Sequence, residues 1–324
     1  MLAEALRSGD RTKLPGRRHE GWRWTDLFGA LTTVPPLNPE RQALGSWSVP
    51  IALDGVVVRR FAAPIQGGVE HVTLEVSAGV HRVVLDLIEA GQGRYVRDLA
   101  FDFTLGVGAS VERLVMIADD ADAVSLATTH VQMQARCDFA QTVLASGARR
   151  QRVETHVDHP GGEGRVRLDG AYLLAGARHA DQTTVVRHLG RDGESRQLVR
   201  GVVAGSARGV FQGRIEVLQG ADGTDARLAH NGLILSDRAE IDSKPELEIY
   251  ADDVACAHGN TIGALDEDAL FYAMSRGLPE AEARRLLITA FVEEVAERIG
   301  HPGLRDQALT FLAAQAEAFD GEGR

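Results

Sequence analysis

One long stretch of the chain, from about Val56 to about Thr261, consists of short apolar or alternating segments divided by Gly, Asp and Asn. In Val72, Leu74 and Val76, for example, apolar residues recur at every second position, which is the period of a strand. No amphipathic helix interrupts the stretch, and a doubly wound α/β sheet needs such helices between its parallel strands. The sequence therefore predicts a large all-β body of about 200 residues.

The spacing of these segments leaves the β architecture open. Their starts recur every ~11–18 residues, which fits a sandwich, a propeller or a solenoid that stacks one strand on the next. Periodicity alone does not choose among the three.

The segment before the β body, residues 1–55, is mixed. It has a short helical start, an aromatic run around Trp22 and Trp24, and a proline-rich connector at residues 34–39. If the aromatic run is extended, Trp22 and Trp24 share a face, and we expect them to anchor this segment by packing.

The last sixty residues change to a helical period. Asp266 can cap a first helix, and apolar residues at i and i+4 predict two more, over about 279–299 and 304–319. We therefore expect three domains: a partly helical segment 1–55, a β core 56–263 and a small helical domain 264–324.

Charge and hydropathy restrict the partners and the location. Lys plus Arg number 35 and Asp plus Glu 46, which gives a net charge of −11, and no segment gathers enough basic residues to follow a phosphate backbone. No run reaches the ~18 apolar residues of a membrane span, and the N-terminus lacks the apolar core of a secretory signal. We therefore expect a cytoplasmic protein without a nucleic-acid or membrane partner, in which Cys137 and Cys256 are free thiols.

Several motifs of stand-alone enzymes are missing from the sequence. It has no G-x-x-x-x-G-K-[ST], so the chain carries no P-loop for ATP, and it has no G-x-S-x-G, H-E-x-x-H or C-x-x-C. We therefore expect no enzyme of these kinds.

Cys256 and His258 are the strongest candidates for chemistry. On a strand, residues i and i+2 share a face, so the thiol and the imidazole would lie side by side. Thiolate and imidazole suit iron, zinc or the edge of a cluster, although two donors do not complete a site. The alternative is structural, with Cys256 as a small core residue and His258 as the cap of a turn.

The other candidates are predicted to be structural. His156 and His159 stand just before a Pro-Gly-Gly sequence and are expected in a solvated turn. Asp252 and Asp253 are adjacent, which favours a turn over an acid–base pair, because adjacent strand side chains point to opposite faces. Cys137 is expected to have a structural role.

The C-terminal third carries the motifs of a known family. Residues 239–254 read AEIDSKPELEIYADDV, residues 256–259 CAHG, residues 270–272 LFY, residues 275–277 SRG and residues 282–287 EARRLL. These runs closely resemble the SufB/SufD family, on its SufD side, whose members are scaffold proteins of the SUF iron–sulfur cluster assembly system. The match is strong from about Phe211 to Ile299 and sparser before it.

The resemblance implies a right-handed parallel β-helix and a non-catalytic scaffold subunit. It implies a SufB partner at the end of the β-helix and a SufC ATPase on the C-terminal helical domain. His258 falls where the family has an interface histidine, so it is implied as an iron ligand shared with the partner, with Cys256 beside it. A transient iron–sulfur cluster or iron at the SufB interface is implied, with no cofactor bound stably by this chain alone, and a homodimer of the isolated chain stays open.

Two departures from the family pattern concern the segment from Gly223 to Gly232. Gly223 replaces a usual glutamine, and the sequence His-Asn-Gly at residues 230–232 departs from an asparagine-rich form. The role of this segment, expected to be a loop, stays open.

A second hypothesis is a carbohydrate-active β-helix lyase or hydrolase. Such enzymes use carboxylates or a metal-assisted base in a groove lined by aromatic residues. Aromatic residues make up only 5% of this chain, and no carboxylate cluster stands out in the β body. The scaffold hypothesis is therefore preferred.

Overall fold

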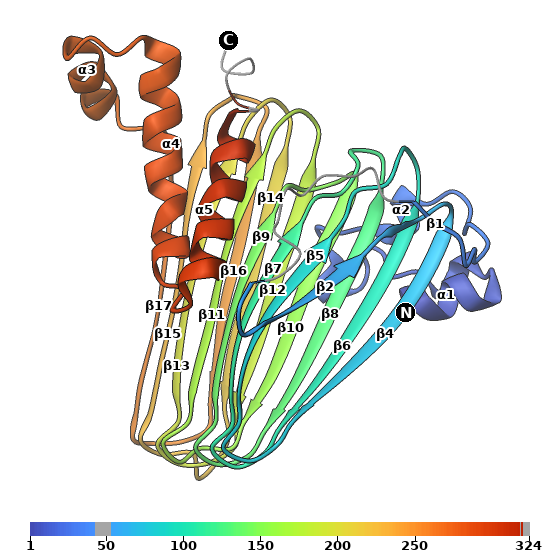
Figure 1. Ribbon diagram of the computed structural model, residues 1–324, viewed down its shortest axis with the longest axis vertical. Coiled ribbons are helices and arrows are strands. Elements are labelled where there is room, and N and C mark those ends of the chain that lie inside the picture. Colours follow the sequence, from blue (N-terminus) through green and yellow to red (C-terminus); the bar gives the residue numbers. More distant parts are fainter. Residues whose placement is uncertain (43–52, 318, 320–324) are drawn as a thin grey trace.

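The chain coils into a β-solenoid that contributes one strand to each of two parallel sheets in every turn (Figure 1). The computed structural model describes residues 1–42, 53–317 and 319. The mainly β, parallel β-helix architecture is confirmed, and the sandwich and the propeller are excluded. The division into three domains stays a prediction, and part of its first segment lies outside the described residues.

The two sheets, here named sheet I and sheet II, are built from strands that alternate along the chain. In spatial order, sheet I consists of β16 (Glu240–Ile249), β14 (Arg208–Val217), β12 (His179–His188), β10 (Arg150–His159), β8 (Val124–Met133), β6 (Val96–Leu105) and β4 (Gly67–Val76). Sheet II consists of β17 (Val254–Gly263), β15 (Thr224–Ile234), β13 (Glu194–Val203), β11 (Arg165–Leu174), β9 (Asp138–Ala145), β7 (Ser110–Ile117), β5 (His81–Ile88) and β2 (Val56–Phe61). A short antiparallel pair, β1 (Arg41–Gln42) with β3 (Ala63–Pro64), lies beside β4.

A fixed register stacks each turn on the one before it. Arg152 of β10 lies opposite Asp181 of β12, 29 residues later in the chain. Parallel neighbours lie about 4.8 Å apart, so residues one turn apart in sequence become direct neighbours in space. This relation decides which side chains meet throughout the molecule.

The space between the sheets is filled by apolar and aromatic side chains. The rings of Phe61 and Phe101 meet edge to face at 5.2 Å between centroids, and those of Phe103 and Phe139 at 5.8 Å. Val217, at the end of β14, is fully buried in the same interior. Strand alternation thus places one apolar row of each strand inside the solenoid.

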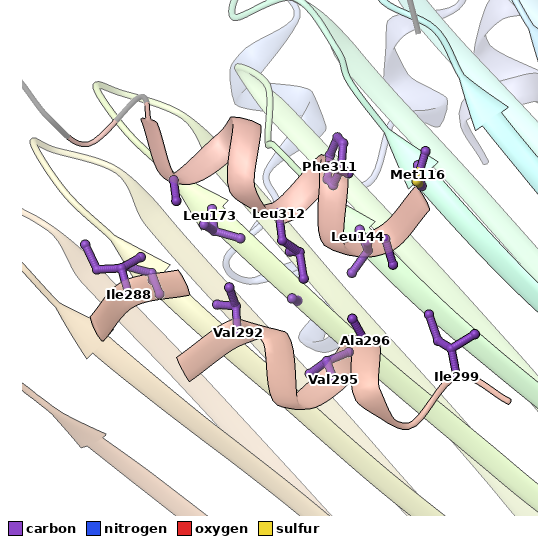
Figure 2. Packing of buried hydrophobic residues seen from close by; sticks show 14 of the residues in the cluster. Met116, Leu144, Leu173, Ile288, Val292, Val295, Ala296, Ile299, Phe311 and Leu312 are labelled. Atoms are coloured by element: carbon purple, nitrogen blue, oxygen red, sulfur yellow. The ribbon is translucent and has the colours of Figure 1, made fainter. Parts of the chain in front are cut away.

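Three C-terminal helices follow the last strand: α3 (Glu267–Ser275), α4 (Glu280–Glu297) and α5 (Pro302–Glu317). The predicted cap is confirmed, because the Asp266 side chain accepts hydrogen bonds from two backbone amides of the first turn of α3. In Figure 2, Val292 and Val295 of α4 and Leu312 of α5 face Leu144 and Leu173 of sheet II. Helices α4 and α5 therefore cover part of the outer face of sheet II, and α3 packs on α4.

Polar contacts fix these helices to sheet II. The Arg298 guanidinium donates to the buried Asp169 carboxylate at 2.9 Å. Glu112 accepts from the backbone amides of Gly300 and His301 at 2.7 and 2.8 Å. The turn between α4 and α5 is thus held on β7 and β11.

The N-terminal segment lies against sheet I through short elements: α1 (Leu2–Ser8), η1 (Arg11–Lys13), η2 (Glu20–Trp22) and α2 (Leu27–Ala30). An extended arrangement of Trp22 and Trp24 is wrong, because Trp22 ends a 3₁₀ turn. Trp22 is nonetheless a packing anchor, since it is buried with the Arg152 guanidinium 4.5 Å from its ring centroid. In the part of the chain described, none of the helices has the length and apolar character to cross a membrane.

We expect Val217→Asp to destabilise the fold by on the order of 3 kcal/mol or more, because the carboxylate would be buried without a partner. Val107→Asp is the control, since Val107 lies in a turn with 38% of its surface exposed. Guanidinium chloride unfolding followed by circular dichroism measures both. Equal stability of the two variants would contradict an inward Val217.

Candidate functional site

Cys256 and His258 lie on β17, which is the last strand of sheet II. The register places Cys256 opposite Ala226 and His258 opposite Leu228 of β15. No strand of the described chain pairs with the other edge of β17, nor with the corresponding edge of β16 in sheet I. The two residues therefore belong to the open terminal turn of the solenoid.

The two side chains share the face predicted from their spacing. Val254 and Cys256 pack against the apolar cluster between the sheets, so alternation turns His258 inward as well. Cys256 is half-buried and His258 is exposed, because no further turn covers the end. A ligand or partner at this end can therefore reach the imidazole directly.

The Cys256 thiol is kept protonated by its surroundings. Burial raises the pKa of the thiol, and the Asp225 carboxylate raises it further, while a backbone hydrogen bond at Ala226 opposes them. A metal ligand must be a thiolate, so an incoming metal or base has to remove this proton first.

The turn beneath the site is held by a buried polar chain. His230 of β15 joins the Tyr172 hydroxyl and the Ser243 hydroxyl at 2.9 Å each, and its ring stacks on Phe211 at 4.9 Å. Burial and, to a smaller extent, the charge of Arg200 lower the pKa of His230 to about 4, so this histidine is neutral at physiological pH. The chain gives the open end a rigid base.

The expectation that residues 223–232 form a loop is wrong. Residues 224–234 form β15, with ladder pairs to β13 and β17 on both sides. Gly223 precedes the strand with a φ of 76°, a value that suits glycine. Polar residues can form a strand here because their backbone groups hydrogen-bond to β13 on one edge and to β17 on the other.

The expectation of a solvated turn at His156 and His159 is also wrong. Both lie on β10, where His156 bonds to Glu154 on the outer face and His159 is fully buried. Stacked ring pairs form with His130 at 5.0 Å and with His188 at 4.9 Å. The sequence signal for these pairs was their separation by about one solenoid turn.

The remaining structural expectations are confirmed. Cys137 is buried and its thiol contacts the Gly106 carbonyl at 3.0 Å. Asp252 and Asp253 lie in the bend between β16 and β17. Cys137 and Cys256 are both free thiols.

The site supplies two donors of its own. Within the residues described, no group of three or more His, Cys, Asp or Glu side chains is arranged to hold a metal ion. Iron or a cluster at Cys256 and His258 would therefore need further donors from another molecule.

A family model described as "SUF system FeS cluster assembly, SufBD core domain" matches residues 60–291, which span most of the solenoid and the start of the helices. The chain belongs to the SufB/SufD family. It is 25% identical to the iron-sulfur cluster assembly protein SufD of Escherichia coli over 376 aligned residues, covering 92% of this chain and 88% of that protein.

Two further relatives agree with the family assignment. The SufD protein of Bacillus subtilis is 35% identical over 130 residues, covering 40% of this chain and 30% of that protein. An iron-sulfur cluster assembly SufBD family protein of Synechocystis is 32% identical over 208 residues, covering 64% of this chain. The chain spans 46% of the length of this last relative. SufD proteins of the SufB/SufD family are thus among the proteins to which the chain is similar.

We expect iodoacetamide at pH 8 to alkylate Cys256 of the folded chain more slowly than free glutathione, because its raised pKa leaves less thiolate. The rate should increase as the pH rises past 9, and Cys137 should react only on unfolding. Mass spectrometry of time points measures both sites. Alkylation of Cys256 that is faster than alkylation of glutathione would contradict a protonated thiol.

Proposed function

We propose that the chain is a non-catalytic scaffold subunit on which iron–sulfur clusters are assembled together with a SufB partner. The observation that carries the proposal is the open last turn, which presents Cys256 and His258 beside unpaired strand edges. Membership of the SUF assembly family supports it. The family match leaves the lyase or hydrolase hypothesis without support.

The proposed SufB contact is the open end of the solenoid. The free edges of β16 and β17 offer backbone donors and acceptors for strand addition. Three large apolar side chains there are exposed: Ile249 by 40%, Tyr250 by 62% and Ile262 by 45%. Unpaired edges next to apolar side chains favour a protein partner, and a second copy of the chain could use the same edges when SufB is missing.

The proposed cargo is iron or a nascent cluster held between the two subunits. Neutral imidazole and thiolate are suitable iron ligands, and this chain offers the imidazole of His258 and the thiol of Cys256, which has to lose its proton before it binds. Because the two side chains supply only part of a ligand set, the cluster would be transient here and completed by donors of SufB.

We expect His258→Ala to lower cluster formation to about a tenth or less while the complex still assembles, since even the loss of a group that only orients a ligand typically costs 10–100-fold in metal affinity. Cys256→Ser should be milder, because its thiol is protonated and half-buried. Acid-labile sulfide in the complex purified from cells measures the cluster, and gel filtration measures assembly.

His71→Ala is the matched control for His258. His71 is also an exposed histidine, but it lies on β4, at the opposite end of the solenoid from β17. Normal cluster content with His258→Ala would refute the ligand role. Loss of the complex itself would instead assign His258 to the interface.

The proposed SufC dock is the surface formed by α3 and the start of α4. Helices α4 and α5 use their apolar faces against sheet II, whereas α3 stands away from both sheets (Figure 1). Its Phe271 is 73% exposed and Tyr272 60%, and Leu286 of α4 is 53% exposed. An apolar surface of this kind suits insertion into a groove of a partner.

We expect the pair Phe271→Glu and Leu286→Glu to abolish co-purification of SufC while SufB still binds, because charge would replace the apolar contact. Leu189→Glu is the control, since Leu189 is 40% exposed in the turn after β12. Affinity purification of the tagged chain measures both partners. Retention of SufC by the double variant would contradict this dock.

A further inference from the structure

A polar cavity of about 620 Å³ lies between the N-terminal segment and the first residues of β10, β12, β14 and β16. Arg23 and Trp24 contribute to one wall. Arg150, His179 and Arg208 contribute to the other, at the starts of three successive strands of sheet I. The volume is typical of a site for a small molecule. No step of the proposed scaffold function uses this cavity.

The walls of the cavity are fixed before any ligand binds. The Trp24 carbonyl lies 3.0 Å from Nε2 of His179, and the Thr25 hydroxyl donates to the buried Asp181 carboxylate. Trp22 is held against the Arg152 guanidinium. A ligand would therefore enter a preformed space.

The lining carries an excess of fixed positive charge. Among the described lining residues are six arginines, Arg17, Arg23, Arg150, Arg178, Arg208 and Arg238, and three carboxylates, Asp26, Glu240 and Asp242. An arginine side chain stays charged in proteins, so the excess of three positive charges persists at any physiological pH. It stands out in a chain whose net charge is −11.

The carboxylates neutralise only part of this charge. Arg17 pairs with Asp26 at 3.3 Å, and Arg208 pairs with Asp242 at 2.7 Å. In the described part of the chain, no carboxylate lies within ion-pair distance of Arg150 or Arg238. An anion in the cavity could pair with these two.

Two buried nitrogen atoms also lack a partner at this place. They are Nε of Arg150 and Nδ1 of His179. The His179 side chain is almost completely buried. The backbone register sets His179 directly opposite Arg208, and burial and the charges of Arg150 and Arg208 lower its pKa to about 4. A buried polar atom without a partner costs free energy. The Nε–H of Arg150 is a donor that a phosphate oxygen would satisfy. Because Nε2 of the neutral His179 donates to the Trp24 carbonyl, its Nδ1 is an acceptor, which a ligand hydroxyl or amine would satisfy.

We infer that this cavity binds a nucleoside diphosphate, with the diphosphate on the arginines and the base against Trp24. Planar guanidinium groups match phosphate oxygens in pairs, and the excess of three positive charges balances a diphosphate. Trp24 is half-buried on the wall, and its indole ring, with the Arg23 guanidinium 5.8 Å from the ring centroid, is the aromatic group against which we place the base. The volume of about 620 Å³ fits a small molecule.

The test is isothermal titration calorimetry of the full chain with ADP, inorganic pyrophosphate, phosphate and adenosine, without divalent cations and at low salt. We expect ADP to bind most tightly, pyrophosphate more weakly, and phosphate and adenosine weakest. Arg150→Gln and Arg238→Gln should each weaken ADP binding about tenfold by removing a charge-assisted contact. Trp24→Ala should weaken ADP and leave pyrophosphate unchanged.

Arg165→Gln is the control, because this exposed arginine of β11 lies outside the cavity and its loss changes the net charge equally. Arg238 is exposed, so its substitution leaves the fold intact, as a thermal melt can confirm. Absence of ADP binding, or binding that Arg238→Gln leaves unchanged, would overturn the site. Equal affinities for ADP and pyrophosphate would overturn the nucleoside part.

Discussion

Each inner strand of the solenoid hydrogen-bonds to the strands one turn before and one turn after it, and the other features of the molecule depend on this parallel register. The ladder satisfies the backbone on both edges, which allows polar side chains to lie inside without breaking the fold. Asp86 shows the result: it is fully buried and accepts from Arg59 at 2.5 Å and from Arg113 at 2.6 Å. Arg113 also donates to Thr129 and Gln141, so its buried guanidinium is held by three neighbouring side chains.

The same ladder has to end, and its last turn is where the candidate function lies. Among the described strands, β17 hydrogen-bonds only to β15, so its other edge is open. The side chain of His258 is exposed at this end. One strand further into the solenoid, His230 hydrogen-bonds to both Tyr172 and Ser243, and Tyr172 and His230 are buried. The molecule thus combines a rigid body with an exposed end, an arrangement suited to holding a cluster between two subunits.

The helical flanks differ in how they use the sheets. Helices α4 and α5 cover part of the outer face of sheet II, while the N-terminal segment crosses sheet I through Trp22 and Thr25. The first arrangement leaves Phe271 and Tyr272 of α3 exposed, and the second forms one wall of the arginine-lined cavity. Both surfaces arise from contacts between segments that are far apart in the sequence.

The sequence by itself determined the β body, its flanking helices, the Asp266 cap and the shared face of Cys256 and His258, because these depend on local periods and on capping chemistry. It also carried the family motifs. Only the tertiary structure decided that His159 stacks on His188, that residues 224–234 form a strand, and that Arg150 and His179 face one cavity. These contacts join residues about one turn apart, or join the N-terminal segment to sheet I. A local pattern does not encode them, because they depend on how many residues complete each turn.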